Sequence, residues 1–160
     1  MVKEKKLSGN KTSIYSVFLL DEEKTMLDRF INENKFSFKS ELKDIINRIK
    51  IIGHKTGARE QFFKLNEGEP GDGVCALYDH PGKNLRLYCI RYGKTLIILG
   101  GGGEKTTQTL QEDSKLKEEN YFLRQIAKDI RKRMQEDEIE FSEDYTDLLG
   151  NLDFKPENYD

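Results

Sequence analysis

The sequence has no tryptophan and only two cysteines, two histidines and three prolines among its 160 residues. Cys75 and Cys89 lack CxxC spacing, so a Cys/His zinc site is excluded, and we expect two small buried thiols and no disulfide. No apolar run is long enough to cross a bilayer, and the charged residues 1–11 are not followed by the apolar core of a secretory signal. We therefore expect a cytoplasmic protein without a membrane segment, metal or cofactor.

Charge is unevenly distributed along the chain. Residues 136–160 contain ten acidic residues and one lysine, a net charge of −9, whereas residues 1–135 contain 26 basic and 19 acidic residues, a net charge of +7. A basic body suggests a polyanionic partner such as nucleic acid, although a solvated surface of mixed charge gives the same composition.

Periodicity predicts the order of the elements. Residues 13–20 and 74–79 are typical of strands, as are the two apolar runs 85–92 and 95–99 joined by a turn at Gly93. Helical spacing of apolar residues predicts a helix that follows an Asp21 cap through residue 34 and a second from Ser40 to Gly53. A third predicted helix spans residues 114–135. We expect both early helices to pack on one face of the sheet.

A hairpin centred near Gly82 would pair Cys75 with Cys89 and Leu77 with Leu87. These four side chains then share one face, which we expect to be core. The opposite face would carry Tyr78, Arg86 and Tyr88. An aromatic and basic sheet face of this kind suits a nucleic-acid groove.

We thus predict an α+β fold with a small antiparallel sheet, in the order strand, two helices, three-stranded meander, helix. Residues 13–135 form the domain, 1–12 a frayed basic arm and 136–160 an acidic extension. A solvated, disordered tail is the simpler interpretation of that extension. Because it contains YTDLLGNLDF, it also has enough apolar residues to dock in cis on the basic body.

The glycine run Gly100–Gly103 is not a phosphate-binding loop. Such a loop needs Gly and Lys adjacent and a helix that starts at once, but Glu104 separates Gly103 from Lys105 and a polar stretch follows. A dinucleotide-binding fold is also excluded, because the glycines follow the last strand of a meander. Spacing suggests no nucleophilic triad and no carboxylate pair.

Cationic chemistry on a basic groove remains. Cleavage of RNA without metal requires activation of the 2′-hydroxyl, neutralisation of the phosphorane charge and protonation of the leaving oxygen. The candidates are Arg86 and Lys105 as catalytic residues, and His54, Lys55, Arg59, Tyr78, Tyr88 and Arg91 as RNA-binding residues. Of these, we expect His54, Lys55 and Arg59 to converge with Arg86 and Lys105 at one end of the sheet.

Two consecutive segments resemble the carboxy-terminal half of the RelE/HigB superfamily of toxin–antitoxin toxins, particularly its phage branch. They are LRLYCIRYGKTLIILGGGGEKTTQTL and the following predicted helix KLKEENYFLRQIAKDIRKRM. Leu85-Arg86-Leu87-Tyr88 is similar to the family's strand of aromatic or Leu, Arg, apolar, aromatic residues. Glu104-Lys105-Thr106 occupies the position of its Lys-rich stretch ending in Lys-Thr.

The resemblance implies an mRNA endoribonuclease that acts on the ribosome or on free mRNA and is held inactive by a cognate antitoxin. It implies that Arg86 is the phosphate-contacting strand arginine and Lys105 the basic residue after the last strand. A non-enzymatic binding module on the same fold is the alternative, either an impaired toxin, a protein binder or a topoisomerase inhibitor like the related ParE branch. Without such a site, Arg86 would be a strand arginine stacked on tyrosine and Lys105 a solvated lysine.

Overall fold

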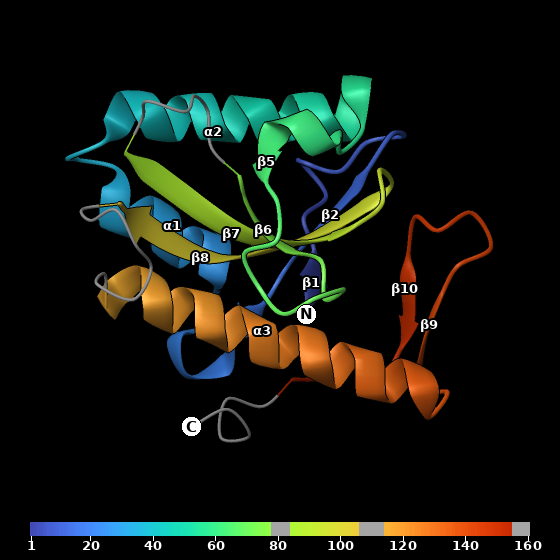
Figure 1. Ribbon diagram of the computed structural model, residues 1–160. Helices are drawn as coiled ribbons and strands as arrows, with labels where there is room; N and C mark the ends of the chain where they lie inside the picture. The colour runs from blue at the N-terminus through green and yellow to red at the C-terminus, as the bar shows by residue number, and fades with distance from the viewer. Residues whose placement is uncertain (78–83, 106–113, 155–160) are drawn as a thin grey trace.

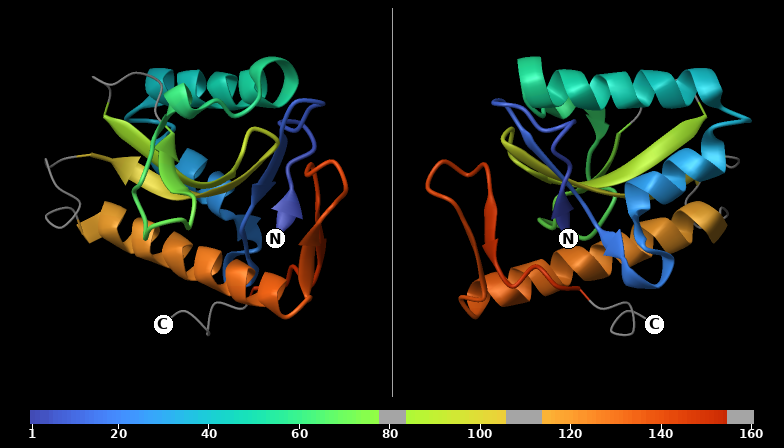
Figure 2. Two further views of the ribbon diagram at one scale, coloured as in Figure 1. Left: turned by 45° about the vertical axis from the view of Figure 1, so that its right-hand side comes forward. Right: turned by 180° about the vertical axis from the view of Figure 1, so that it is seen from behind.

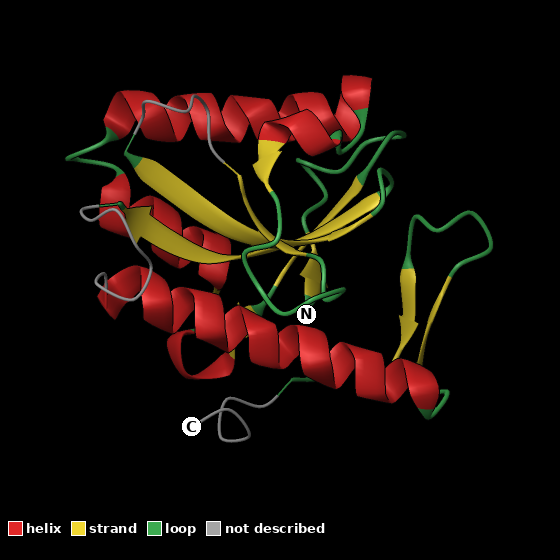
Figure 3. Ribbon diagram, in the orientation of Figure 1, coloured by secondary structure: helices red, strands yellow, loops and turns green. Residues whose placement is uncertain are grey.

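Successive residues of the central strands point to opposite faces of the sheet, and both sets are apolar, so both faces must be covered. The computed structural model describes residues 1–77, 84–105 and 114–154. It shows a mixed α+β fold with a mostly antiparallel sheet. One helix covers one face, one long helix covers the other, and a short helix runs beside β8 between them (Figures 1 and 3).

The main sheet has the strand order β1-β2-β8-β7-β6-β5. Its strands are β1 (Val2–Lys3), β2 (Ser13–Ser16), β5 (Phe63–Lys64), β6 (Val74–Leu77), β7 (Leu85–Tyr92) and β8 (Leu96–Glu104). The predicted register is confirmed, since Cys75 pairs with Cys89 and Leu77 with Leu87. Strand β2 runs parallel to β8, a pairing that needs a long crossover, and the two early helices provide it.

Both early helices bury apolar residues in the core cluster on one face of the sheet, as predicted. They are α1 (Met26–Asn34) and α2 (Lys39–Ile51), and one π-helical turn (Ile52–Thr56) extends α2. The predicted cap at Asp21 is wrong. A short hairpin of β3 (Phe18–Leu19) and β4 (Lys24–Thr25) intervenes, and Thr25 caps α1 through reciprocal bonds with Asp28.

Helix α3 (Ser114–Gln135) has the predicted bounds and covers the other face. Its apolar stripe packs on side chains that include Tyr88, which is only 3% exposed. The expected open aromatic and basic face is therefore wrong at Tyr88, because an amphipathic helix of this length must bury its stripe and uses this face. Tyr78 lies outside the described residues.

Both ends of the described chain are built into the domain. The expected frayed arm instead forms β1, which pairs with β2. Strands β9 (Ile139–Phe141) and β10 (Leu148–Gly150) form a hairpin beside β1 (Figure 2). Ile139, Leu148 and Phe154 are buried in the core under α3, so the expectation of a solvated tail is wrong for residues 136–154.

Candidate functional site

The glycine run forms the second half of β8 and is not a loop. Two residues of β8, Gly100 and Gly101, stand opposite the single residue Tyr88 of β7, which makes a β-bulge. A Cβ on Gly100 would lie 2.9 Å from a methyl group of Leu123, and one on Gly101 would overlap the Glu119 carboxylate. The missing side chains thus let α3 approach the sheet and make room for a charged group there.

That charged group is the Glu119 side chain, which is 6% exposed. Arg29 of α1 donates to both of its oxygens at 2.6 and 2.7 Å, and the Lys115 ammonium donates at 2.7 Å and also reaches Glu33 at 3.3 Å. Burial lowers the pKa of Lys115, but the hydrogen bonds and charges of Glu119 and Glu33 outweigh burial and raise it. The network therefore ties α1 to α3 across Gly101.

Arg86 and Lys105 lie at the same end of the sheet, beside the start of α3. Arg86 pairs with Gly103, and the Lys105 amide donates to the Asn84 carbonyl at 2.8 Å, so the ladder continues to Lys105. Lys105 is thus the diagonal neighbour of Arg86 on the same face, and diagonal neighbours lie about 7–8 Å apart. Glu104 pairs with the core residue Leu85 and points to the opposite face.

Gly103 lies on the same sheet face, directly opposite Arg86 and two residues before Lys105. A Cβ there would lie 3.5 Å from Lys115 Cγ, so the lysine stem passes over this position on its way to Glu119. Arg86 is half-buried and donates to the Leu85 carbonyl at 2.9 Å, and Lys105 is half-buried as well. Two cations therefore face one side of the hairpin, an arrangement suited to a phosphate group. The neighbouring Lys115 ammonium is already paired with Glu119 and Glu33.

The other predicted basic residues do not join them. Arg91 lies five residues along β7 from Arg86, about 17 Å away. Its Nε donates to the Ala58 carbonyl at 2.8 Å, and the Ala58 amide donates to Lys94, which places the loop with Arg59 at the turn between β7 and β8. Arg91 is committed to holding that loop.

His54 and Lys55 also lie at this far end, in the π-helical turn after α2, and both are exposed. A Cβ on Gly9 would lie 2.5 Å from His54 Nδ1, so the imidazole lies against the amino-terminal segment. The expected convergence of His54, Lys55 and Arg59 with Arg86 is therefore wrong. The reason is topological, since the helix pair returns the chain to the opposite end of the sheet.

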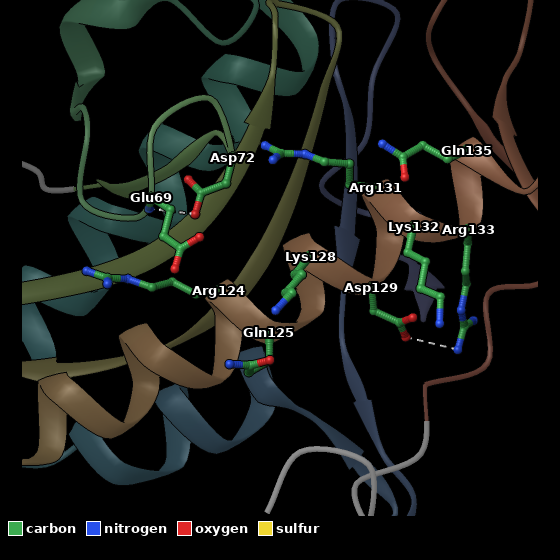
Figure 4. A pocket seen from close by; sticks show the side chains of 10 residues that line it. All are labelled: Glu69, Asp72, Arg124, Gln125, Lys128, Asp129, Arg131, Lys132, Arg133 and Gln135. Carbon is green, nitrogen blue, oxygen red and sulfur yellow. Dashed lines mark hydrogen bonds and ion pairs between the residues drawn. The ribbon is translucent and has the colours of Figure 1, made fainter.

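Helix α3 carries a second cationic surface that the sequence analysis did not single out. Arg124, Lys128 and Arg131 recur at intervals of four and three residues, which places them along one side of the helix. With Lys132 they line a cavity of about 610 Å³ against Glu69 and Asp72 of the loop between β5 and β6 (Figure 4). The helical spacing of these basic residues was the available signal.

The loop opposite α3 is firmly anchored. Asn120 Nδ2 and Arg124 Nη2 both donate to the Glu67 carbonyl at 2.9 Å. Asp72 accepts from the backbone amides of Glu69 and Val74 at 2.8 and 2.9 Å. The cavity wall is therefore preformed.

The described residues contain neither a candidate metal-binding cluster nor a candidate membrane-spanning helix. No group of three or more His, Cys, Asp or Glu side chains in the described ranges is arranged to hold a metal. Cys75 and Cys89 are buried free thiols, as expected. In the same part of the chain no helix has the length and apolar character needed to span a membrane.

Comparison with known proteins adds nothing to this geometry. No family model matches the chain, and neither a curated protein nor a solved structure matches it.

Proposed function

We propose that the chain is a RelE-like toxin that binds mRNA and cleaves it at the end of the sheet that holds Arg86 and Lys105. The order of its elements supports the proposal, because strand β2 is followed by the helix pair α1 and α2, the meander β6 to β8 and the final helix α3. The segment Leu85-Arg86-Leu87-Tyr88 begins β7, and Lys105 directly follows β8.

The observation that carries the proposal is the shared face of Arg86 and Lys105. Residues 19 positions apart in sequence are brought within a diagonal step of each other by the β7–β8 ladder. Both are mounted on or next to strands, so their charges are positioned before a ligand arrives. Glu104 points to the other face of the sheet and does not intrude between them.

In this proposal the two side chains stabilise charge. The 2′-hydroxyl loses its proton to water and its oxygen attacks the adjacent phosphorus. The P–O5′ bond breaks and the 5′-oxygen takes a proton from water, which yields a 2′,3′-cyclic phosphate and a 5′-hydroxyl. In the transition state, negative charge grows on the non-bridging phosphate oxygens. The Arg86 guanidinium offers paired N–H groups to those oxygens, and the Lys105 ammonium adds a second positive charge. Loss of one preorganised donor of this type lowers a turnover rate by about 100-fold or more.

The test is to express the chain in a translating extract and map new RNA ends. Arg86→Ala and Lys105→Ala should each reduce cleavage by about 100-fold, with an unchanged circular dichroism spectrum and melting temperature. Arg59→Ala and Lys55→Ala are matched controls, because they remove the same charges from the far end of the sheet, and they should cleave like the parent chain. Full cleavage by the Arg86 and Lys105 variants, or equal losses in the controls, would exclude this site.

A non-catalytic binding module of the same fold is the second candidate. The observation in its favour is that α3 and the segment 139–154 cover the sheet face that contains Tyr88. Such a module would block its target, for example a topoisomerase, by occupancy alone. Growth arrest without new RNA ends would support it, and in both cases co-expression of an antitoxin that covers the basic body should relieve the arrest.

A further inference from the structure

The basic side of α3 continues beyond the cavity to an exposed aromatic ring. Tyr121 is 37% exposed, and the Lys117 and Arg124 cations lie 5.5 and 4.7 Å from its ring centroid. A smaller hollow of about 200 Å³ is lined by Tyr121 together with Glu69, Arg124, Gln125 and Lys128, which also line the larger cavity. The two hollows therefore form one groove, about 16 Å long between Tyr121 and Lys132.

The cations of this groove differ in how they are used. Arg133 pairs with Asp129 at 3.1 Å and also donates to the carbonyls of Asn151 and Asp153, so it holds the segment after β10 in place. Lys128, Arg131 and Lys132 are exposed, and none of them forms an ion pair with another described residue. Three cations are thus presented to solvent along one side of a helix.

Arg124 joins the ring to the loop. Its Nη2 is held by the Glu67 carbonyl, while its Nε is buried and has no partner among the described residues. Both Asp72 oxygens accept backbone N–H groups of the loop, which hold this carboxylate in place. The groove is lined by five basic and three acidic side chains, so its net charge is positive.

We propose that this groove binds single-stranded RNA, with a base against Tyr121 and successive phosphates on Lys128, Arg131 and Lys132. A basic track beside an aromatic ring is the combination that single strands need, because every base has a stacking face and every linkage has a charge. The choice of RNA rests on the proposed function. The groove lies on the outer side of α3, whereas Arg86 and Lys105 lie near its start, so it would hold a strand apart from the cleavage site.

The test measures the affinity of the full chain for a fluorescein-labelled 12-mer RNA that is 2′-O-methylated throughout and hence cannot be cleaved. Tyr121→Ala should weaken binding roughly tenfold, and Tyr121→Phe should bind like the parent. Lys128→Gln and Lys132→Gln should each lower the slope of log affinity against log salt by about 0.7, the value for one phosphate contact of a single strand. Lys43→Gln removes an exposed lysine from α2 and should change nothing.

Two competitors separate the sources of phosphate. A blunt duplex of the same sequence should compete poorly, because its bases are stacked and cannot reach Tyr121, and free UMP should compete only at concentrations far above those of the strand. Parental affinity in the Tyr121→Ala and Lys128→Gln variants overturns the proposal. Equal losses with Lys43→Gln, equal competition by UMP, or no binding by the parent chain overturns it as well.

The outcome is independent of cleavage. If the α3 variants bind RNA normally and cleavage requires Arg86, the RNA-binding role of the groove is refuted and the proposed endoribonuclease activity is supported. If RNA binding requires Tyr121 and Lys128 but the chain produces no new RNA ends, the groove is supported and the proposed endoribonuclease activity is refuted.

Discussion

Replacement of Gly101 by alanine tests the packing of β8 against α3. The new Cβ would overlap the Glu119 carboxylate, lie 2.6 Å from its Cδ and come within 3.0 Å of Arg29 Nη2. Glu119 would have to move by about 1 Å to reach normal contact, and its bonds to Arg29 and Lys115 oppose that movement. The substitution therefore strains a buried ion pair and leaves the strand backbone unchanged.

The cost follows from two opposing effects. Removing one partner of a buried ion pair costs about 3–5 kcal/mol, and a displaced pair loses part of that, while overpacking alone costs about 1–3 kcal/mol. Alanine regains about 0.5–1 kcal/mol over glycine within a strand. We expect a net loss of about 2 kcal/mol in the free energy of unfolding, which lowers the melting temperature by roughly 4–8 °C.

The measurement is urea unfolding of a double-mutant cycle. In a Glu119→Ala background the new methyl meets no carboxylate, so Gly101→Ala should cost less than about 0.5 kcal/mol there. Gly103→Ala in the same strand is the control, because the nearest atom to its Cβ is Lys115 Cγ at 3.5 Å, and it should be neutral or slightly stabilising. An equal loss from Gly101→Ala in both backgrounds would refute the assignment of the glycine to the Glu119 network.

Two further predictions concern the core. Tyr15→Phe should lower the free energy of unfolding in urea by about 1–3 kcal/mol, because the buried Leu148 amide loses the Tyr15 hydroxyl that accepts its hydrogen bond at 3.2 Å. Lys3→Ala breaks only an exposed ion pair with Asp147 and should cost less than about 1 kcal/mol. A larger loss from Lys3→Ala than from Tyr15→Phe would contradict this role of Tyr15. Burial raises the pKa of the Cys75 thiol to about 12 and that of the Cys89 thiol well above its usual range. At pH 8 neither thiol of the folded protein should therefore react with a disulfide reagent, whereas two thiols per chain should react after unfolding. Rapid reaction of the folded protein would show that the strands β6 and β7 open.

The sequence predicted those features that depend on neighbours along the chain. The bounds of α3 follow from an apolar stripe at helical spacing, and the pairing of β6 with β7 follows from a short turn that leaves one register with a continuous core face. The start of α1 was missed, because Thr25 and Asp28 form a capping box inside the stretch that was predicted to follow an Asp21 cap. Both signals were present in the residues, and only the observed hydrogen bonds distinguish them.

For the candidate site, the sequence singled out Arg86 and Lys105 but did not place them on one face. Their shared face depends on the β-bulge opposite Tyr88, which shifts the β7–β8 register by one residue. The sequence also did not place Arg59 and His54 correctly, because their distance from Arg86 depends on where α2 returns the chain. The basic side of α3 was visible as a helical repeat of cations. These residues line a groove only because the loop with Glu69 and Asp72 forms its second wall, and Asn120 and Arg124 hold that loop against the helix.

The sequence by itself determined the central strands β2, β6, β7 and the first half of β8, the three helices apart from the start of α1, the β6–β7 register and the segregation of charge between residues 1–135 and 136–160. Only the tertiary structure decided that β2 pairs with β8 in parallel, that α3 buries Tyr88, and that Ile139, Leu148 and Phe154 complete the same core. The physical reason is that burial is not directional. An apolar stripe specifies that a face must be covered, whereas its partner is chosen among distant segments by the packing of the whole chain.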